Sequence, residues 1–224
     1  MPLRIGDAAP ARVYAGDDAL SRIYAGDDLI WSGLTAIADS FNRANHSTSL
    51  GPDYVNYVQG GTHGIASNRY STTGGDGRKS ALHVTPMSTD NYDVGITQAV
   101  AAASRRSGII VRSTANFSSW IAYLTSSVSG VLVRGAGLVG HEDSNVTNLF
   151  TRSGSTAAAT LITVEVRGNV YTIKHGGTAV GTYTDSGLLV PMGNRHVGVQ
   201  SITAVLGSSN YAARDDFLGG GVAR

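Results

Sequence analysis

The chain has 224 residues, a formal net charge of +1 and no cysteine. Its 17 basic and 16 acidic residues nearly balance and form no long basic run, so the sequence predicts no nucleic-acid partner. Without cysteine there are no disulfides or thiolate metal sites, and no stretch reaches the roughly 20 apolar residues of a membrane span. The first residues lack the apolar core of a signal peptide, so we expect synthesis in a cytoplasm and no membrane insertion.

The first 33 residues contain a tandem repeat. Residues 12–20 read RVYAGDDAL, residues 22–30 read RIYAGDDLI, and Trp31 follows. In each unit a β-branched residue and a tyrosine favour a strand, and Gly-Asp-Asp favours a turn. The sequence therefore predicts two miniature hairpins over residues 1–33.

Two such hairpins bury too little apolar surface to be stable alone, so their apolar side chains require a partner. This partner is the following domain, a symmetry mate or another protein, and the predicted contact residues are Tyr14, Tyr24, Leu29, Ile30 and Trp31. The paired aspartates of the repeat raise the alternative of a cation site. Their spacing lacks the distal Glu of an EF-hand loop, so turn chemistry is the better interpretation, and we expect no metal.

A short linker over residues 34–38 is predicted to precede an all-β domain over residues 39–224. Alternating apolar residues bounded by Gly, Asn, Asp or Ser recur about every 8–12 residues, which is typical of a sandwich or barrel. The predicted strands are His63–Tyr70, Ser80–Thr85, Tyr92–Ala101, Gly108–Ser113, Trp120–Ser126, Gly130–Arg134, Leu161–Arg167, Val170–His175, Thr178–Tyr183, Val197–Ile202 and Arg214–Leu218. Turns at Gly168-Asn169 and Gly176-Gly177 predict three consecutive antiparallel strands.

The sequence shows no catalytic constellation. The six histidines have no metal-ligand spacing, and the compact cluster His141-Glu142-Asp143 is interpreted as a solvated loop. Only two glutamates are present, Glu142 and Glu165, and neither forms the paired-carboxylate pattern of a sandwich glycosidase. We therefore expect a protein that is not an enzyme and that needs no cofactor.

Three residues are candidates for sugar binding: Arg112, Trp120 and Tyr123. Trp120 and Tyr123 lie three apart on one predicted strand, so they face opposite sides of the sheet. If Arg112 and Tyr123 share an open face, they can stack on a sugar and hydrogen-bond to it, and Trp120 is the alternative. Core or interface packing of both aromatics is the favoured competing interpretation.

The repeat at residues 12–31 resembles the opening segment of minor tail proteins from phages of actinobacteria. This resemblance implies that residues 1–33 anchor the chain to other virion proteins, and that the protein is a homo-oligomer, with a trimer favoured. It implies a virion location, with the tail favoured over the capsid surface.

The main domain resembles the concanavalin A-like, or laminin-G-like, jelly-roll β-sandwich. The matching pieces, in order, are residues 39–44, 49–51, 64–69, 92–97, 108–112, 120–124 and 215–217. Asp39 and Phe41 near the start and Asp216 and Phe217 near the end suggest that the first and last strands pair.

Together the two resemblances imply a minor tail protein that displays a lectin-like domain toward cell-envelope glycans. One alternative is a capsid decoration or head-fibre protein with the same two parts. Another is an enzyme that degrades an envelope polysaccharide.

Overall fold

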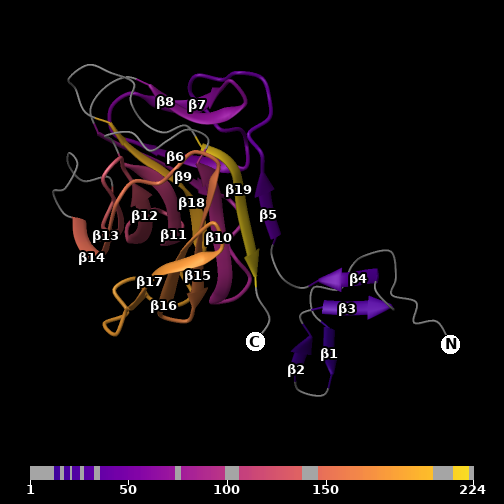
Figure 1. Cartoon of the computed structure of the whole chain (residues 1–224). Helices are drawn as coiled ribbons and strands as arrows, with labels where there is room; N and C mark the ends of the chain where they lie inside the picture. The colour runs from indigo at the N-terminus through magenta and orange to yellow at the C-terminus, as the bar shows by residue number, and fades with distance from the viewer. Residues whose placement is uncertain are drawn as a thin grey trace.

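The computed structural model describes residues 13–15, 18–20, 22–25, 28–32, 36–73, 77–98, 106–137, 146–203 and 214–221. Within these ranges every regular element is a β-strand, and each strand pairing is antiparallel (Figure 1). The described part of the chain contains no helix that is long and apolar enough to cross a membrane. The predicted all-β class is confirmed.

Each repeat unit folds as a hairpin, as predicted. The four strands are β1 (Val13–Ala15), β2 (Asp18–Leu20), β3 (Arg22–Ala25) and β4 (Asp28–Ser32). Strand β1 pairs with β2, and β3 pairs with β4, as two separate two-stranded sheets. The five predicted contact residues lie on these strands: Tyr14 in β1, Tyr24 in β3, and Leu29, Ile30 and Trp31 in β4. Their contact with a virion stays a prediction.

The main domain consists of two large sheets. The eight-stranded sheet contains β5 (Ala36–Asp39), β7 (Thr62–Ala66), β8 (Arg69–Thr73), β10 (Asn91–Gln98), β15 (Thr160–Arg167), β16 (Val170–His175), β17 (Thr178–Thr184) and β19 (Arg214–Gly221). The seven-stranded sheet contains β6 (Tyr54–Val58), β9 (Gly77–His83), β11 (Ser107–Ser113), β12 (Trp120–Thr125), β13 (Ser129–Gly135), β14 (Val146–Ser153) and β18 (His196–Thr203).

The strand order in both sheets differs from the chain order. It is β17-β16-β15-β10-β19-β8-β7 in the eight-stranded sheet, with β5 also paired to β19, and β14-β13-β12-β11-β18-β9-β6 in the seven-stranded sheet. Figure 1 shows the two sheets stacked on each other. Strands that are distant in the chain therefore meet in the middle of each sheet, as in β-sandwiches with Greek-key connections.

The main core lies between the two sheets. Alternation along β15 turns Ile162, Val164 and Val166 inward, and each of these side chains is at most 1% exposed. From the facing sheet, Ile121 and Tyr123 of β12 enter the same cluster. Period-two patterning thus places the apolar side chains of both sheets in one layer.

A second apolar cluster lies on the opposite face of the seven-stranded sheet. Its buried members are Leu82, Ile110, Phe117, Trp120, Ala122, Leu124, Val131, Val133 and Ile202. Because β12 is buried along its whole length, its run Trp-Ile-Ala-Tyr-Leu-Thr packs on both sides. The seven-stranded sheet therefore carries apolar side chains on both faces, as strands with near-continuous hydrophobic runs do.

The structure corrects four details of the predicted strands. The single strand expected over His63–Tyr70 is a hairpin, because Ser67 and Asn68 adopt positive φ angles of 53° and 58° and turn the chain between β7 and β8. The predicted linker over residues 34–38 is wrong at its end, because β5 pairs with β19 and belongs to the sandwich. Strands β6 and β14 were not predicted.

The predicted pairing of the first and last strands of the domain is confirmed. Strand β5 pairs with β19, with Asp39 opposite Phe217 and Ala36 opposite Gly220. Strand β19 pairs with β10 along one side, and on its other side with β8 only at Arg214 and Tyr70. Strand β5 therefore covers the part of β19 that would otherwise be an open sheet edge. The hairpins β15–β16–β17 also form with the predicted turns.

Candidate binding pocket at one end of the sandwich

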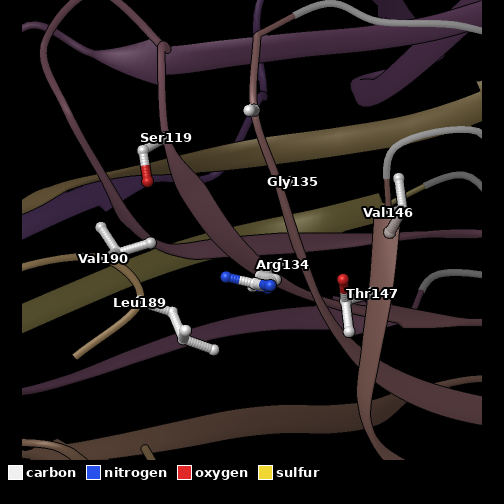
Figure 2. A pocket seen from close by; sticks show the side chains of 8 residues that line it. Ser119, Arg134, Gly135, Val146, Thr147, Leu189 and Val190 are labelled. Atoms are coloured by element: carbon white, nitrogen blue, oxygen red, sulfur yellow. The ribbon is translucent and has the colours of Figure 1, made fainter. Parts of the chain in front are cut away.

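A pocket of about 410 Å³ opens at one end of the sandwich. Its lining residues come from three places, namely the start of β12, the adjoining ends of β13 and β14, and the loop after β17; they are Ser119, Arg134, Gly135, Ala136, Val146, Thr147, Leu189 and Val190. Figure 2 shows the Arg134 side chain between Leu189 and Val190 on one side and Thr147 on the other. The pocket thus combines one guanidinium, two hydroxyl groups and an apolar wall.

Strand register brings the polar groups of the pocket together. Arg134 lies opposite Thr147 of β14 and opposite Ile121 of β12 in the antiparallel ladder. Residues directly opposite each other in such a ladder project from the same face of the sheet. Ser119 immediately precedes Trp120, which pairs with Gly135, so its hydroxyl lines the same end of the sheet.

The apolar wall belongs to the loop over residues 185–195, and Asp185 holds the start of this loop. The Asp185 amide donates to the Asn169 carbonyl at 2.9 Å, and the Asn169 side chain donates back to the Asp185 carbonyl at 3.2 Å. The Leu189 amide donates to Asp185 Oδ2 at 2.9 Å. Leu189 is therefore fixed to the β15–β16 turn through Asp185.

The end of the same loop is fixed by an ion pair. Arg195 Nε lies 3.1 Å from Asp90 Oδ1, and the Gly193 amide donates to that oxygen at 2.8 Å. Burial acts to raise the pKa of Asp90, but Arg195 and the Gly193 amide together hold this pKa below its ordinary value. Because both ends are tied down, Leu189 and Val190 form a preorganised wall.

The three residues predicted to bind sugar are all inside the protein. Arg112 and Tyr123 are 0% exposed and Trp120 is 1% exposed. Tyr123 belongs to the core between the sheets and Trp120 to the cluster on the other face, so the predicted opposite orientation is confirmed. None of them lines the pocket, and their role in sugar binding stays a prediction.

Each of these three side chains has a packing role. Arg112 Nη2 donates to the Gly168 carbonyl at 2.8 Å, and its guanidinium carbon lies 5.6 Å from the centroid of the Tyr171 ring. Trp120 Nε1 donates to the Gly137 carbonyl at 3.0 Å. The Tyr123 hydroxyl lies 3.0 Å from His175 Nε2, so it joins the two sheets across the core.

Trp120 also lies in a stack of flat side chains. Its ring is 5.4 Å from Phe117, which is 5.1 Å from Tyr57, and the Arg78 guanidinium carbon lies 4.6 Å from the Trp120 ring. Arg78 in turn donates to Gln200 Oε1 at 2.7 Å. These contacts, together with the hydrogen bond to Gly137, give the buried Trp120 ring a packing role.

The described part of the chain contains no cluster of acidic side chains that could bind a metal ion or act in catalysis as a pair of glutamates. Within it, no three His, Cys, Asp or Glu side chains gather closely enough to hold a metal ion. Glu165 forms a salt bridge of 2.5 Å with Lys174, so its carboxylate already has a basic partner. The cluster His141-Glu142-Asp143 lies outside the described residues.

Sequence reasoning missed the pocket because its parts are far apart in the chain. Arg134 was placed as the last residue of a predicted strand, and β14, which carries Val146 and Thr147, was not predicted. The available signal was weak: a strand that ends in an arginine beside hydroxyl residues also fits a solvated strand end.

No protein-family model and no curated protein matches the chain. Among solved structures, carbohydrate-binding module CBM66 from Bacillus subtilis is similar with a TM-score of 0.52 at 12% identity, over 73% of this chain and 91% of that chain. The CBM2 module of the evolved Dit of Lactobacillus casei BL23 phage J-1 is similar with a TM-score of 0.53 at 12% identity, over 85% of this chain and 99% of that chain.

A third similar structure is a longer chain than this one. It is the GH43 protein BlXynB from Bacillus licheniformis, with a TM-score of 0.55 at 12% identity, and the match covers 83% of this chain but 39% of that chain. At these identities the comparisons establish the fold. The chain is a jelly-roll β-sandwich of the type found in lectins and carbohydrate-binding modules.

Proposed function

We propose that this chain is a non-catalytic, glycan-binding virion protein of a tailed bacteriophage, carried as a minor tail protein through its N-terminal hairpins. The observation that carries the glycan-binding part is the pocket at the end of the sandwich. Its single guanidinium, two hydroxyl groups and apolar wall match what sugars present, namely hydroxyl groups around a ring edge and an apolar face of C–H groups.

The virion part of the proposal is supported by two independent observations. One similar sandwich is a module of a phage Dit. In addition, the tandem hairpins form two sheets of their own, separate from both sheets of the sandwich. A two-stranded hairpin is marginal in water, so a partner surface would stabilise the pair of hairpins. We expect several copies per particle, with a trimer favoured.

Absence of catalysis is part of the proposal. None of the residues that line the pocket is acidic, whereas glycosidases of the usual kind place two carboxylates on either side of the scissile bond. Glu165, the glutamate in the described part of the chain, is paired with Lys174 instead.

The experiment that tests the proposal measures binding and turnover in parallel. The whole protein is applied to an array of bacterial envelope glycans, and the bound glycans are then incubated with it while released reducing ends are measured. Binding without release supports the proposal. Release of reducing ends supports the enzyme alternative, and absence of binding to every glycan supports a purely architectural role. Immunogold labelling of particles distinguishes the tail from the capsid alternative.

A further inference from the structure

We propose that the pocket selects an anionic saccharide, meaning a sugar that carries a carboxylate or phosphate group, and that Arg134 provides the selection. This inference rests on the proposed glycan-binding function and specifies its ligand class. It starts from the charge of the pocket, where one cationic and no anionic side chain lines the wall.

Three arginines of this fold have an acidic partner, and Arg134 differs from them. Arg43, Arg167 and Arg195 each pair with an aspartate, at 2.6, 2.7 and 3.1 Å. No described residue forms an ion pair or a hydrogen bond with the Arg134 guanidinium. Burial, and secondarily the charge of Asp185, raises the pKa of Tyr183, and the charge of Arg134 opposes this rise.

The side chain is also held in a partly buried position. Arg134 is half-buried at the end of β13, between Thr147 and the fixed wall of Leu189 and Val190. A guanidinium that has lost part of its hydration without gaining a counter-charge favours binding of an anion. Its planar fork of N–H donors matches carboxylate and phosphate oxygens in a bidentate geometry, which a neutral hydroxyl cannot reproduce.

The remaining groups of the pocket fit the rest of a sugar. The Ser119 and Thr147 hydroxyls can each donate to or accept from ring hydroxyl groups. Leu189 and Val190 offer an apolar surface to the C–H face of the ring. The volume of about 410 Å³ lies at the lower end of the range for small-ligand sites, so we expect the pocket to hold the charged sugar and the neighbouring units to lie outside.

The test compares matched acidic and neutral probes on the whole protein. Isothermal titration calorimetry measures binding of cellobiouronic acid against cellobiose, and of glucose 6-phosphate against glucose, and an array of acidic and neutral envelope glycans extends the comparison. We expect the best acidic glycan to bind at least about tenfold more tightly than its neutral counterpart. This preference should weaken as NaCl rises from about 0.05 M to about 0.5 M.

Variants assign the preference to the pocket. Arg134→Gln should abolish the acidic preference, and Arg134→Lys should keep part of it, because an ammonium retains the charge but loses the fork. Arg152→Gln is the matched control, since Arg152 lies on β14 outside the pocket and donates to the Gly154 carbonyl at 3.0 Å. Thermal melting of each variant verifies that it is folded.

The outcomes separate this inference from the proposed function. Binding of neutral and acidic glycans with equal affinity would overturn the anionic selection and leave glycan binding in place. An acidic preference that Arg134→Gln leaves intact would overturn the role of the pocket. Binding of no glycan of either kind would overturn both proposals, and enrichment of phosphorylated over carboxylated glycans would identify the source of the anion.

Discussion

The ring of Phe150 on β14 lies against Gly181 on β17, and the distance leaves no room for a Cβ atom at position 181. These strands are the outermost ones of the two sheets on the same side of the sandwich. Phe150 and Val180 both pack against the core between the sheets. The contact therefore closes one lateral side of the sandwich along β14, the same edge strand that carries Thr147 into the pocket.

The first prediction concerns the effect on stability of adding a methyl group at position 181, where Phe150 packs against the backbone. Gly181→Ala should destabilise the protein by about 1–3 kcal/mol, because the added Cβ overlaps the Phe150 ring in a well-packed region. Urea unfolding followed by tryptophan fluorescence measures the change. Gly220→Ala is the matched control, because nothing lies within 4 Å of a Cβ at that position, and it should change stability by less than about 0.5 kcal/mol. Equal effects of the two substitutions would contradict the prediction.

A second prediction concerns the cluster on the outer face of the seven-stranded sheet. Trp120→Ala should destabilise the fold by roughly 3–5 kcal/mol, because it removes a buried ring that contacts both Phe117 and the Arg78 guanidinium. Val128→Ala, at a residue that is 71% exposed, should be close to neutral. Chemical denaturation monitored by circular dichroism gives both values. A folded Trp120→Ala protein of unchanged stability that has lost glycan binding would instead identify Trp120 as a ligand contact.

The third prediction is a pH dependence caused by His63. This residue is 1% exposed, and neither of its ring nitrogens has a partner among the described residues. Burial, and secondarily the charge of Lys79, lowers the pKa of His63 from 6.5 to about 4. Between these two pH values the unfolded chain binds a proton that the folded chain does not.

The stability of the fold should therefore fall as the pH drops from 6.5 toward 4, by up to ~3 kcal/mol, and this group should have no further effect above pH 6.5. His63→Phe should flatten this slope, as measured by urea unfolding at a series of pH values. His46→Gln, at an exposed histidine, should retain it. A slope that is identical in His63→Phe and the unaltered protein would show that another group is responsible.

The fourth prediction separates the hairpins from the sandwich. Deletion of residues 1–33 should leave a folded sandwich that no longer joins phage particles. Deletion of residues 1–39 should in addition lower the melting temperature, because it removes β5 and leaves one side of β19 without its partner. Circular dichroism measures folding, and co-sedimentation with particles measures incorporation. If the protein without residues 1–33 assembles normally, the hairpins are not the anchor.

The parts of the fold that could be predicted are those specified by local chemistry. Gly168, Gly176 and Gly177 adopt positive φ angles of 61°, 56° and 83°, so the turns of the β15–β16–β17 hairpins are encoded in adjacent residues. The two hairpins of the repeat follow from the same signals. Ser67 and Asn68 turn the chain without glycine, and for that reason the β7–β8 hairpin was mistaken for one strand.

Features that depend on tertiary contacts could not be predicted in the same way. Arg134 and Leu189 are far apart in the chain and meet only because Asp185 and Asp90 fix the loop beside β13. The second apolar cluster did leave a signal, since the unbroken runs around Ile110 and Trp120 indicate strands that are buried on both faces. If such a strand is assumed to be buried on one face only, either Trp120 or Tyr123 must face solvent, and both therefore became binding candidates.

The pairing of Ala36 with Gly220 has a consequence for how this sandwich is built into larger chains. The first and last strands of the domain run side by side, so the polypeptide arrives and departs through points separated by only ~5 Å. A domain with such neighbouring ends can be transplanted into an exposed loop of an unrelated protein without stretching either one. The domain from Ala36 to Gly221 therefore has the geometry of a unit that can be inserted whole into another polypeptide.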